Sequence, residues 1–203
     1  MPIFIRRNSG YIYILCVPPT VYEVLAEIDL IKALQARICE NKQICNRFGG
    51  YRYVDGFGCL PTARRNNEEM VFVPNKLAQD WDSHKHAASD CGGRLADIFD
   101  ETENEKVYLA FEDSTRMFIG GTQQQPCDDE PSGCWVWSNG AEMTYKNWLS
   151  SQPNNYFGNE NCMLLFQVMS SSQWNDHPCF NKWPAIYIIP PTFNTISTCK
   201  FFP

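Results

Sequence analysis

Oxygen-bearing side chains cluster in two short segments toward the C-terminal end of the chain. Both segments are expected to be loops, and an apolar stretch typical of a strand separates them. A cysteine stands beside each segment, Cys162 after the first and Cys179 after the second. A hard cation such as Ca²⁺ takes roughly six to eight oxygen ligands from carboxylates, amide carbonyls and water. Amides and carboxylates at this density, with no histidine or cysteine among them, favour Ca²⁺ over Zn²⁺. The candidate ligands are Gln152, Asn154, Glu160, Asn175 and Asp176.

The motifs that carry these side chains resemble those of the C-type lectin family. In that family a Glu-Pro-Asn or Gln-Pro-Asp loop, an acidic residue shortly before a cysteine, and a Trp-Asn-Asp triplet bind Ca²⁺ and sugar together. Here Gln152-Pro153-Asn154, Glu160 before Cys162, and Trp174-Asn175-Asp176 stand in the same order, and the resemblance covers roughly residues 69–189. The upstream motifs that agree in order are Trp81 to Cys91 followed by Gly92-Gly93-Arg94-Leu95-Ala96, then Phe118-Ile119-Gly120-Gly121, Trp135–Gly140 and Asn147-Trp148.

The resemblance implies an α+β C-type lectin-like fold, with two helices, short antiparallel strands, a long Ca²⁺-binding loop region and stapling disulfides. The residue pattern also predicts two helices. Gly92-Gly93 ends one expected over 79–91, and Asp100 with Glu103 caps a second that runs to about Phe111. Short aromatic or β-branched segments bounded by turn residues then predict strands. The expected strands are Met117–Ile119, Cys134–Ser138, Met163–Val168 and Ala185–Ile189. The resemblance places Trp135, Trp137, Trp148 and Trp174 in the core.

We expect three parts along the chain: an N-terminal extension over 1–68, a C-type lectin-like domain over 69–189 and a tail over 190–203. The extension contains an amphipathic helix over about 20–38. Packing of this helix against the lectin domain is favoured over a coiled-coil neck, because the run is shorter than the roughly three to four heptads of a coiled coil. Glycine-rich and proline-containing residues 46–69 predict turns and a linker, with the domain boundary near Asn67.

The ten cysteines indicate an oxidising compartment and favour a secreted, extracellular protein. No C-x₂-C pair that would suit zinc occurs, and buried free thiols are the alternative to disulfides. Arg6-Arg7 and the apolar run over 11–17 faintly resemble a signal peptide, although Pro18-Pro19 ends the run early. No stretch approaches the ~20 apolar residues of a membrane span.

The resemblance also implies disulfide pairings. Cys162 pairs with Cys179, while Cys127 and Cys134 bracket a turn-rich acidic loop and are expected to close on each other. Tyr187 stands where the family places the partner of Cys91, and we expect Cys199 in the tail to substitute. Four further cysteines allow two bridges in the N-terminal region, with three connectivities that sequence does not distinguish. These are Cys16, Cys39, Cys45 and Cys59.

By the same resemblance, Ca²⁺ sits between the loops and two vicinal sugar hydroxyls complete its shell. Pro153 is expected to follow a cis peptide bond, as in family members. Asn155 and Asn161 occupy auxiliary-site positions where acids are usual, so we expect no second ion there. The side chains expected to contact the sugar are Gln152, Asn154, Tyr156, Glu160 and Asn175.

The charge of the ligand set predicts weak binding of Ca²⁺. Gln152 and Asn154 are both amides, so only Glu160 and Asp176 carry negative charge. Extracellular Ca²⁺ modules have dissociation constants of about 10⁻⁴–10⁻³ M, and ligand charge tunes this affinity. The family's Glu-Pro-Asn implies mannose-type and Gln-Pro-Asp galactose-type ligands, which makes Gln-Pro-Asn a hybrid. Tyr156 either stacks on the apolar face of galactose or packs inward. The sequence weakly favours galactose-type over mannose-type glycans.

The expected partners are glycans on glycoproteins or cell surfaces. A net charge of −6 argues against nucleic acid, which needs a basic surface. No nucleophile motif occurs and we expect no enzyme activity, with His84 and His86 facing solvent on their helix. The N-terminal helix and unpaired cysteines offer a route to homo-oligomers. The alternative is a Ca²⁺-independent protein-binding or structural extracellular module that uses the acidic loop at Asp128–Glu130.

Overall fold

The computed structural model describes residues 3–7, 10–14, 45, 49–54, 57–110, 116–168 and 171–191. The chain divides into two compact units, Met1–Arg37 and Ile38–Pro203. In the first unit, β1 (Ile3–Arg7) and β2 (Gly10–Ile14) form an antiparallel pair. The amphipathic helix expected over about 20–38 lies outside the described residues, as does the expected tail over 190–203 except for its first two residues.

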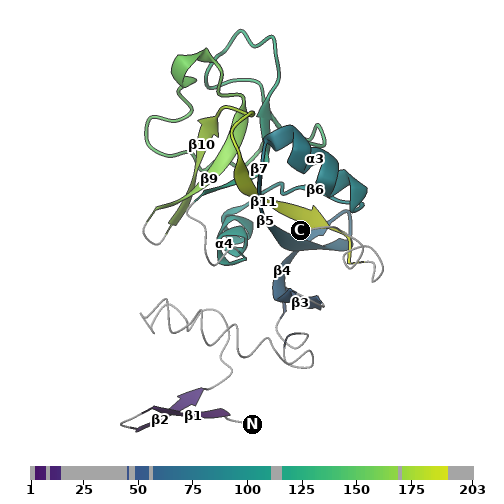
Figure 1. The fold of residues 1–203 in the computed structure, drawn as a ribbon, viewed down its shortest axis with the longest axis vertical. Helices are drawn as coiled ribbons and strands as arrows, with labels where there is room; N and C mark the ends of the chain where they lie inside the picture. The colour runs from purple at the N-terminus through teal and green to yellow at the C-terminus, as the bar shows by residue number, and fades with distance from the viewer. Residues whose placement is uncertain are drawn as a thin grey trace. The chain divides into compact units, whose positions relative to one another are not determined.

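A nine-stranded sheet forms the second unit (Figure 1). Its main path has the order β10-β9-β7-β11-β5-β4-β3, with β6 paired to β11 and β8 paired to β7. The strand pairs are antiparallel except β7 with β11, which are parallel. The strands are β3 (Tyr51–Val54), β4 (Gly58–Arg65), β5 (Glu68–Gln79), β6 (Arg94–Leu95), β7 (Arg116–Gln123), β8 (Trp135–Trp137), β9 (Cys162–Val168), β10 (Ser171–His177) and β11 (Trp183–Ile189).

Two helices accompany the sheet, as expected, and side chains cap both. Helix α3 (Trp81–Asp90) begins where the Asp80 carboxylate accepts a hydrogen bond from the Ser83 backbone N–H. Helix α4 (Glu101–Leu109) begins in the same way at Asp100, whose carboxylate accepts from the Glu103 N–H. Each cap satisfies one of the backbone donors that a helix start leaves free. A single 3₁₀ turn, η2 (Tyr156–Gly158), lies in the long loop before β9.

Alternation along the strands gives the sheet two apolar faces. In β5, Met70 and Phe72 belong to the cluster that also contains Val107 of α4. The intervening Val71 and Val73 belong to a second cluster. That second cluster contains Trp81 and Ala88 of α3. Successive side chains of a strand point to opposite faces, so the sheet is covered on both sides.

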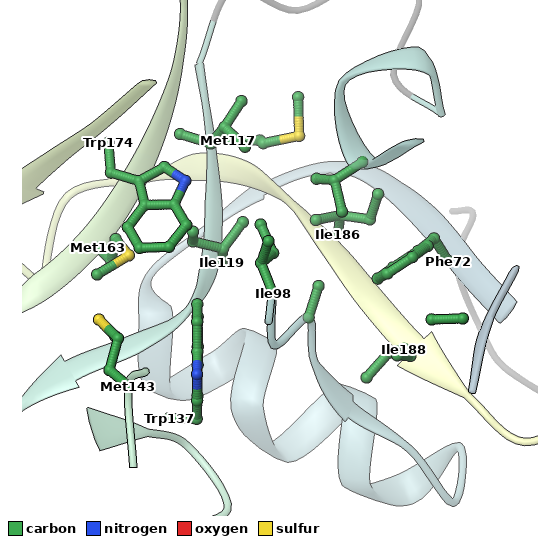
Figure 2. Packing of buried hydrophobic residues seen from close by; sticks show 14 of the residues in the cluster. Phe72, Ile98, Met117, Ile119, Trp137, Met143, Met163, Trp174, Ile186 and Ile188 are labelled. Carbon is green, nitrogen blue, oxygen red and sulfur yellow. The ribbon is translucent and has the colours of Figure 1, made fainter. Parts of the chain in front are cut away.

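The first cluster is rich in tryptophan and methionine (Figure 2). Trp137 and Trp174 are buried and meet edge to face with ring centroids 5.7 Å apart. Met163 packs beside them and leaves no room for a side chain at Gly121, where an added Cβ would lie 2.6 Å from the Met163 Cε. Trp135 is also buried, and the partly buried Trp148 packs against the cluster. The expectation that all four tryptophans belong to the core is confirmed.

The prediction of turns and a linker over 46–69 is wrong, because this segment supplies β3, β4 and the start of β5. Pro61 removes one backbone donor and suggested a loop, yet β4 accommodates it opposite Tyr51 of β3. β4 pairs with β5 from Thr62↔Val71 to Arg65↔Glu68. The boundary expected near Asn67 thus falls in the turn between two paired strands, where Asn66 and Asn67 have positive φ.

Arg65 ties this additional hairpin to the rest of the fold. Its guanidinium contacts the Asp97 carboxylate at 3.0 Å and the Glu103 carboxylate at 2.5 Å. The Asp97 side chain is 1% exposed, so its charge depends on partners within the protein. Arg94 supplies the second partner of Asp97. The hairpin and the start of α4 are therefore joined by a nearly buried ion network.

Three disulfides are present among the described cysteines: Cys45–Cys59, Cys127–Cys134 and Cys162–Cys179. The last two are the pairings expected from the sequence. Cys91 is also disulfide-bonded. The partner proposed for it, Cys199, lies outside the described residues, and that pairing stays a prediction.

The expectation that His84 faces solvent is wrong. His84 is fully buried, and its Nδ1 lies 2.7 Å from the Tyr187 hydroxyl, which also accepts a hydrogen bond from Asn75. The other ring nitrogen lies 2.7 Å from the Trp183 carbonyl oxygen. Burial lowers the pKa of His84 and favours the neutral ring. Tyr187 of β11 thus connects α3 and β5 through hydrogen bonds.

Candidate functional site

The sheet brings the two oxygen-rich segments together at one end of β9 and β10. These strands pair with Asp176 opposite Met163 and His177 opposite Cys162. Glu160 precedes Cys162 by two residues and therefore lies beside the end of β10. The Cys162–Cys179 disulfide fixes the same junction covalently.

Asp176 is the centre of the candidate site. It is fully buried, and its Oδ2 accepts hydrogen bonds from the backbone N–H groups of Asn154 at 2.9 Å and Asn155 at 2.6 Å. The peptide bond between Gln152 and Pro153 is cis, as expected. Asp176 Oδ1 and Gln152 Oε1 are both buried, and neither accepts a hydrogen bond from the part of the chain that the structure describes.

Glu160 joins this group through the same loop. It is 8% exposed, and its Oε2 accepts a hydrogen bond from the Tyr156 N–H at 2.8 Å. The Asn154 Oδ1 accepts from the same N–H at 3.0 Å. Asn154, Glu160 and Asp176 therefore belong to one hydrogen-bonded group, and Gln152 precedes Asn154 by two residues in the same loop. Asn175 is the adjacent residue on β10, and its side-chain amide donates to the Asp176 carbonyl. The loop expected at Asn175 and Asp176 is therefore wrong, because both residues pair with β9 as part of a strand.

The electrostatics of the site disfavour its own negative charge. Burial raises the pKa of Glu160, and repulsion from Asp176 raises it further, while the hydrogen bond from Tyr156 opposes the shift. Burial also lowers the pKa of His177, followed by repulsion from Arg116, so the ring beside Glu160 favours its neutral form. The two carboxylates therefore lack a positive partner in His177.

This donor set fits a hard cation. Two buried oxygens lack donors, and a buried polar atom without a partner is costly. A cation beside Asp176 and Glu160 would offset both the burial and the repulsion that raise the pKa of Glu160. The described residues contain no group of three or more His, Cys, Asp or Glu side chains placed to hold a metal. Amide oxygens of Gln152, Asn154 and Asn175 would therefore have to complete the coordination.

The sequence reasoning missed Glu130 as a neighbour of this loop. Its Oε2 accepts a hydrogen bond from the Asn155 side chain at 2.7 Å, and the Asn155 Oδ1 accepts from the Glu160 N–H at 3.1 Å. Gln125 donates both to Glu130 and to Asn161. The disulfide-closed acidic loop thus supports the candidate site through Asn155. The bracketing cysteines were the available signal, since they hold this loop in a defined position.

Two aromatic side chains protrude from the same loop. Tyr156 is 62% exposed and Phe157 is 86% exposed. Inward packing of Tyr156, one of the two alternatives left by the sequence, is therefore excluded.

The chain matches a known protein family and a characterised relative in sequence. The family model described as "Lectin C-type domain" matches residues 77–186, which is more than half of the chain. Ladderlectin of Oncorhynchus mykiss is 29% identical over 129 residues, which cover 62% of this chain and 65% of ladderlectin. The chain therefore spans just under two thirds of that relative.

A second relative and a solved structure are also similar to this chain. The alpha-N-acetylgalactosamine-specific lectin of Patiria pectinifera is 27% identical over 120 residues, covering 58% of this chain and 71% of that lectin. The solved structure of herring type II antifreeze protein aligns with a TM-score of 0.52 and 26% identity, covering 64% of this chain and 95% of that chain. The α+β architecture expected from the sequence is thus found in known structures.

Proposed function

Because this chain belongs to the C-type lectin domain family, whose members are non-enzymatic binding proteins, we propose that it is a Ca²⁺-dependent carbohydrate-binding lectin. The observation that carries the proposal is the pair of buried oxygens, Gln152 Oε1 and Asp176 Oδ1, for which the described residues supply no donor. Asp176 belongs to the hydrogen-bonded group that also contains Asn154 and Glu160, and Gln152 lies in the same loop as Asn154. Asn175 completes the proposed ligand set.

Each proposed ligand has a separate role. Asp176 holds the loop through two backbone amides with one oxygen and keeps the other for the ion. Glu160 orients the Tyr156 backbone and supplies the second negative charge. The bound Ca²⁺ would supply positive charge and coordination positions for two sugar hydroxyls. Gln152, Asn154, Glu160 and Asn175 would hydrogen-bond those hydroxyls, since amides both donate and accept.

We propose a weak preference for galactose-type glycans. The exposed Tyr156 ring is available to pack on the apolar face of a sugar, and aromatic rings favour such contacts. The similarity to a lectin named as specific for alpha-N-acetylgalactosamine agrees with this preference. The hybrid Gln152-Pro153-Asn154 motif leaves mannose-type glycans as the competing ligand class.

We further propose a secreted or extracellular location, with glycans on glycoproteins or cell surfaces as partners and homo-oligomers as a means to raise avidity. The three described disulfides agree with an oxidising compartment. In the part of the chain that the structure describes, no helix has the length and apolar character needed to cross a membrane.

A Ca²⁺-independent protein-binding module is the second candidate. Hydrogen bonds to Asp176 and Glu160 already order residues 154–156, so the loop holds its shape through contacts within the protein. In that case the acidic loop at Asp128–Glu130 would serve as the contact surface, and its binding would survive a chelator.

A glycan array with and without EDTA tests the proposal, together with calorimetric titration of Ca²⁺. Asp176→Asn removes one of the two charges and should lower Ca²⁺ affinity about tenfold or more. Asn154→Asp and Gln152→Glu each add a charge, should tighten Ca²⁺ binding, and should shift the array toward galactose-type and mannose-type glycans respectively. Asp129→Asn, an exposed acid outside the ligand set, is the matched control. Array signal that EDTA leaves unchanged would contradict the proposal and favour the protein-binding module.

A further inference from the structure

Tyr156 and Phe157 form an exposed aromatic pair with ring centroids 4.1 Å apart and planes inclined by 55°. Large exposed hydrophobic side chains are few among the described residues: Tyr156, Phe157 and Phe180. Two of the three are therefore adjacent in sequence and in contact. A contiguous exposed apolar surface is a feature that marks binding sites.

Phe157 occupies a backbone conformation that its side chain does not favour. Its φ is 63° and its ψ is 10°, inside the left-handed region. Its neighbours Asn155 and Gly158 also have positive φ, and both are residue types that adopt it readily. A bulky residue at positive φ is an outlier, and such strain gathers at functional sites. Because Phe157 is 86% exposed, burial within the described structure does not compensate for that strain.

The aromatic pair borders the proposed sugar site directly. The Tyr156 N–H donates to Glu160 Oε2 and to Asn154 Oδ1, two of the proposed ligand atoms. Because the pair follows Asn154 directly in the loop that leads to Glu160, a group attached to a sugar at these ligands is close enough to reach the aromatic rings. The surface next to the sugar would then be apolar, in contrast to the amides and carboxylates that meet the hydroxyls.

We propose that Phe157, which contacts the Tyr156 ring on the sugar's apolar face, forms an apolar subsite for a hydrophobic aglycone, an alkyl or aryl group linked directly to the bound sugar. The ligand class is thus narrowed from glycans in general to glycosides in which an apolar group follows the terminal sugar. This inference rests on the proposed function of the Ca²⁺ loop. It explains why phenylalanine stands at a position whose backbone suits glycine or asparagine.

Paired glycosides that differ only in the aglycone test the inference. Affinities of the whole chain for methyl and hexyl β-galactoside, and for methyl and hexyl α-mannoside, are measured by calorimetry in Ca²⁺. The hexyl member of the bound pair should bind at least about fivefold tighter, since each CH₂ taken from water adds affinity. Phe157→Gly and Phe157→Asn should reduce this hexyl-to-methyl ratio to about one.

Thermal melting of the variants separates binding from folding. Phe157→Gly and Phe157→Asn should melt at the wild-type temperature or above it, because both residues suit positive φ. Phe180→Ala, which removes a 67% exposed aromatic from the turn after Cys179, should keep the wild-type ratio.

Each contrary outcome has a separate meaning. Methyl glycoside binding with a wild-type ratio near one would overturn the aglycone subsite and leave the lectin proposal standing. A ratio that persists in both Phe157 variants would also overturn it. Failure of every glycoside to bind would overturn the proposed function and the subsite together.

Discussion

At the residue scale, the candidate site depends on two carboxylates that the protein keeps buried near each other. Asp176 receives backbone hydrogen bonds, whereas burial and Asp176 together raise the pKa of Glu160. The side chains therefore provide charge for a cation at a cost to the Ca²⁺-free protein. The amides at 152, 154 and 175 add oxygen atoms without adding repulsion, which fits a weakly binding site.

Acidification should weaken Ca²⁺ binding through Glu160. Its pKa is raised, so the carboxylate takes up a proton at a higher pH than an exposed glutamate and then competes with the ion. Below that pKa, the apparent Ca²⁺ affinity should fall about tenfold per pH unit. Calorimetric titration from pH 7 downward checks this slope. Glu160→Gln should bind more weakly at neutral pH and should lose this part of the pH dependence.

The stability of the Ca²⁺-free protein should depend on pH in the opposite sense. A folded-state pKa raised above its unfolded value contributes stability at low pH, which is lost as the pH rises through the folded-state pKa. The lowered pKa of His177 contributes stability that is lost as the pH falls through its folded-state pKa. Melting curves of Glu160→Gln and His177→Gln should separate these opposing contributions. An identical pH profile in Glu160→Gln and wild type would contradict the role of Glu160.

At the element scale, disulfides hold the loops in position, and ion pairs between side chains hold the β4–β5 hairpin. The Cys127–Cys134 loop reaches the candidate site through Glu130 and Asn155. The β4–β5 hairpin reaches α4 through Arg65 and Glu103. Both contacts join segments far apart in the sequence, which is why local patterns did not predict them.

Glu130→Gln should lower Ca²⁺ affinity severalfold while the melting temperature stays near that of wild type. The Glu130 carboxylate accepts from Asn155, whose other side-chain atom accepts from the Glu160 N–H, so the substitution weakens the positioning of Glu160. Calorimetry with Ca²⁺ measures the effect. Asp128→Asn changes the same net charge at an exposed position of the same loop and should bind Ca²⁺ like wild type. Equal losses in both variants would indicate a general charge effect.

Arg65→Met should destabilise the protein by about 3 kcal/mol, because it leaves the buried Asp97 and Glu103 carboxylates with less compensation. Arg52→Met is the matched control, since it removes an arginine of the neighbouring strand β3 whose ion pair with Glu69 is 33% and 40% exposed. That change should cost only about 0–1 kcal/mol. Urea unfolding of both variants measures the difference. Similar decreases in the free energy of unfolding would show that the Arg65 network stabilises the protein no more than an exposed ion pair.

At the scale of the whole molecule, the sequence predicted the family, the two capped helices and the strands β7, β8, β9 and β11, because short motifs carry these features in order. It did not predict β10, because the polar residues of Ser171–His177 resemble a loop. It did not predict β3 and β4, because glycines and Pro61 there resemble a linker. The burial of His84, by contrast, is predictable from its spacing along the helix. His84 lies three residues after Trp81 and four before Ala88, so all three share the buried face of α3.

Truncation tests where the lectin domain begins. A fragment that starts at Glu69 lacks β4 and loses Arg65, so it should fail to melt cooperatively or should melt far below the full chain. A fragment that starts at Ile38 keeps the second compact unit and the Cys45–Cys59 disulfide, and should melt like the full chain. Circular dichroism melting decides between them. Cooperative melting of the shorter fragment would support the boundary near Asn67.

The buried hydrogen bonds of Tyr187 have a consequence for chemical resistance. The link from α3 to β11 and β5 runs through His84, Tyr187 and Asn75, and contains no sulfur. The link between the two halves of the candidate site is the Cys162–Cys179 disulfide. A reducing agent cleaves the disulfide link and leaves the hydrogen-bonded link of Tyr187 intact. Ligand recognition in this protein should thus be sensitive to reduction, whereas the contacts of His84 and Asn75 with Tyr187 should persist when the disulfides, including the one at Cys91 at the end of α3, are reduced.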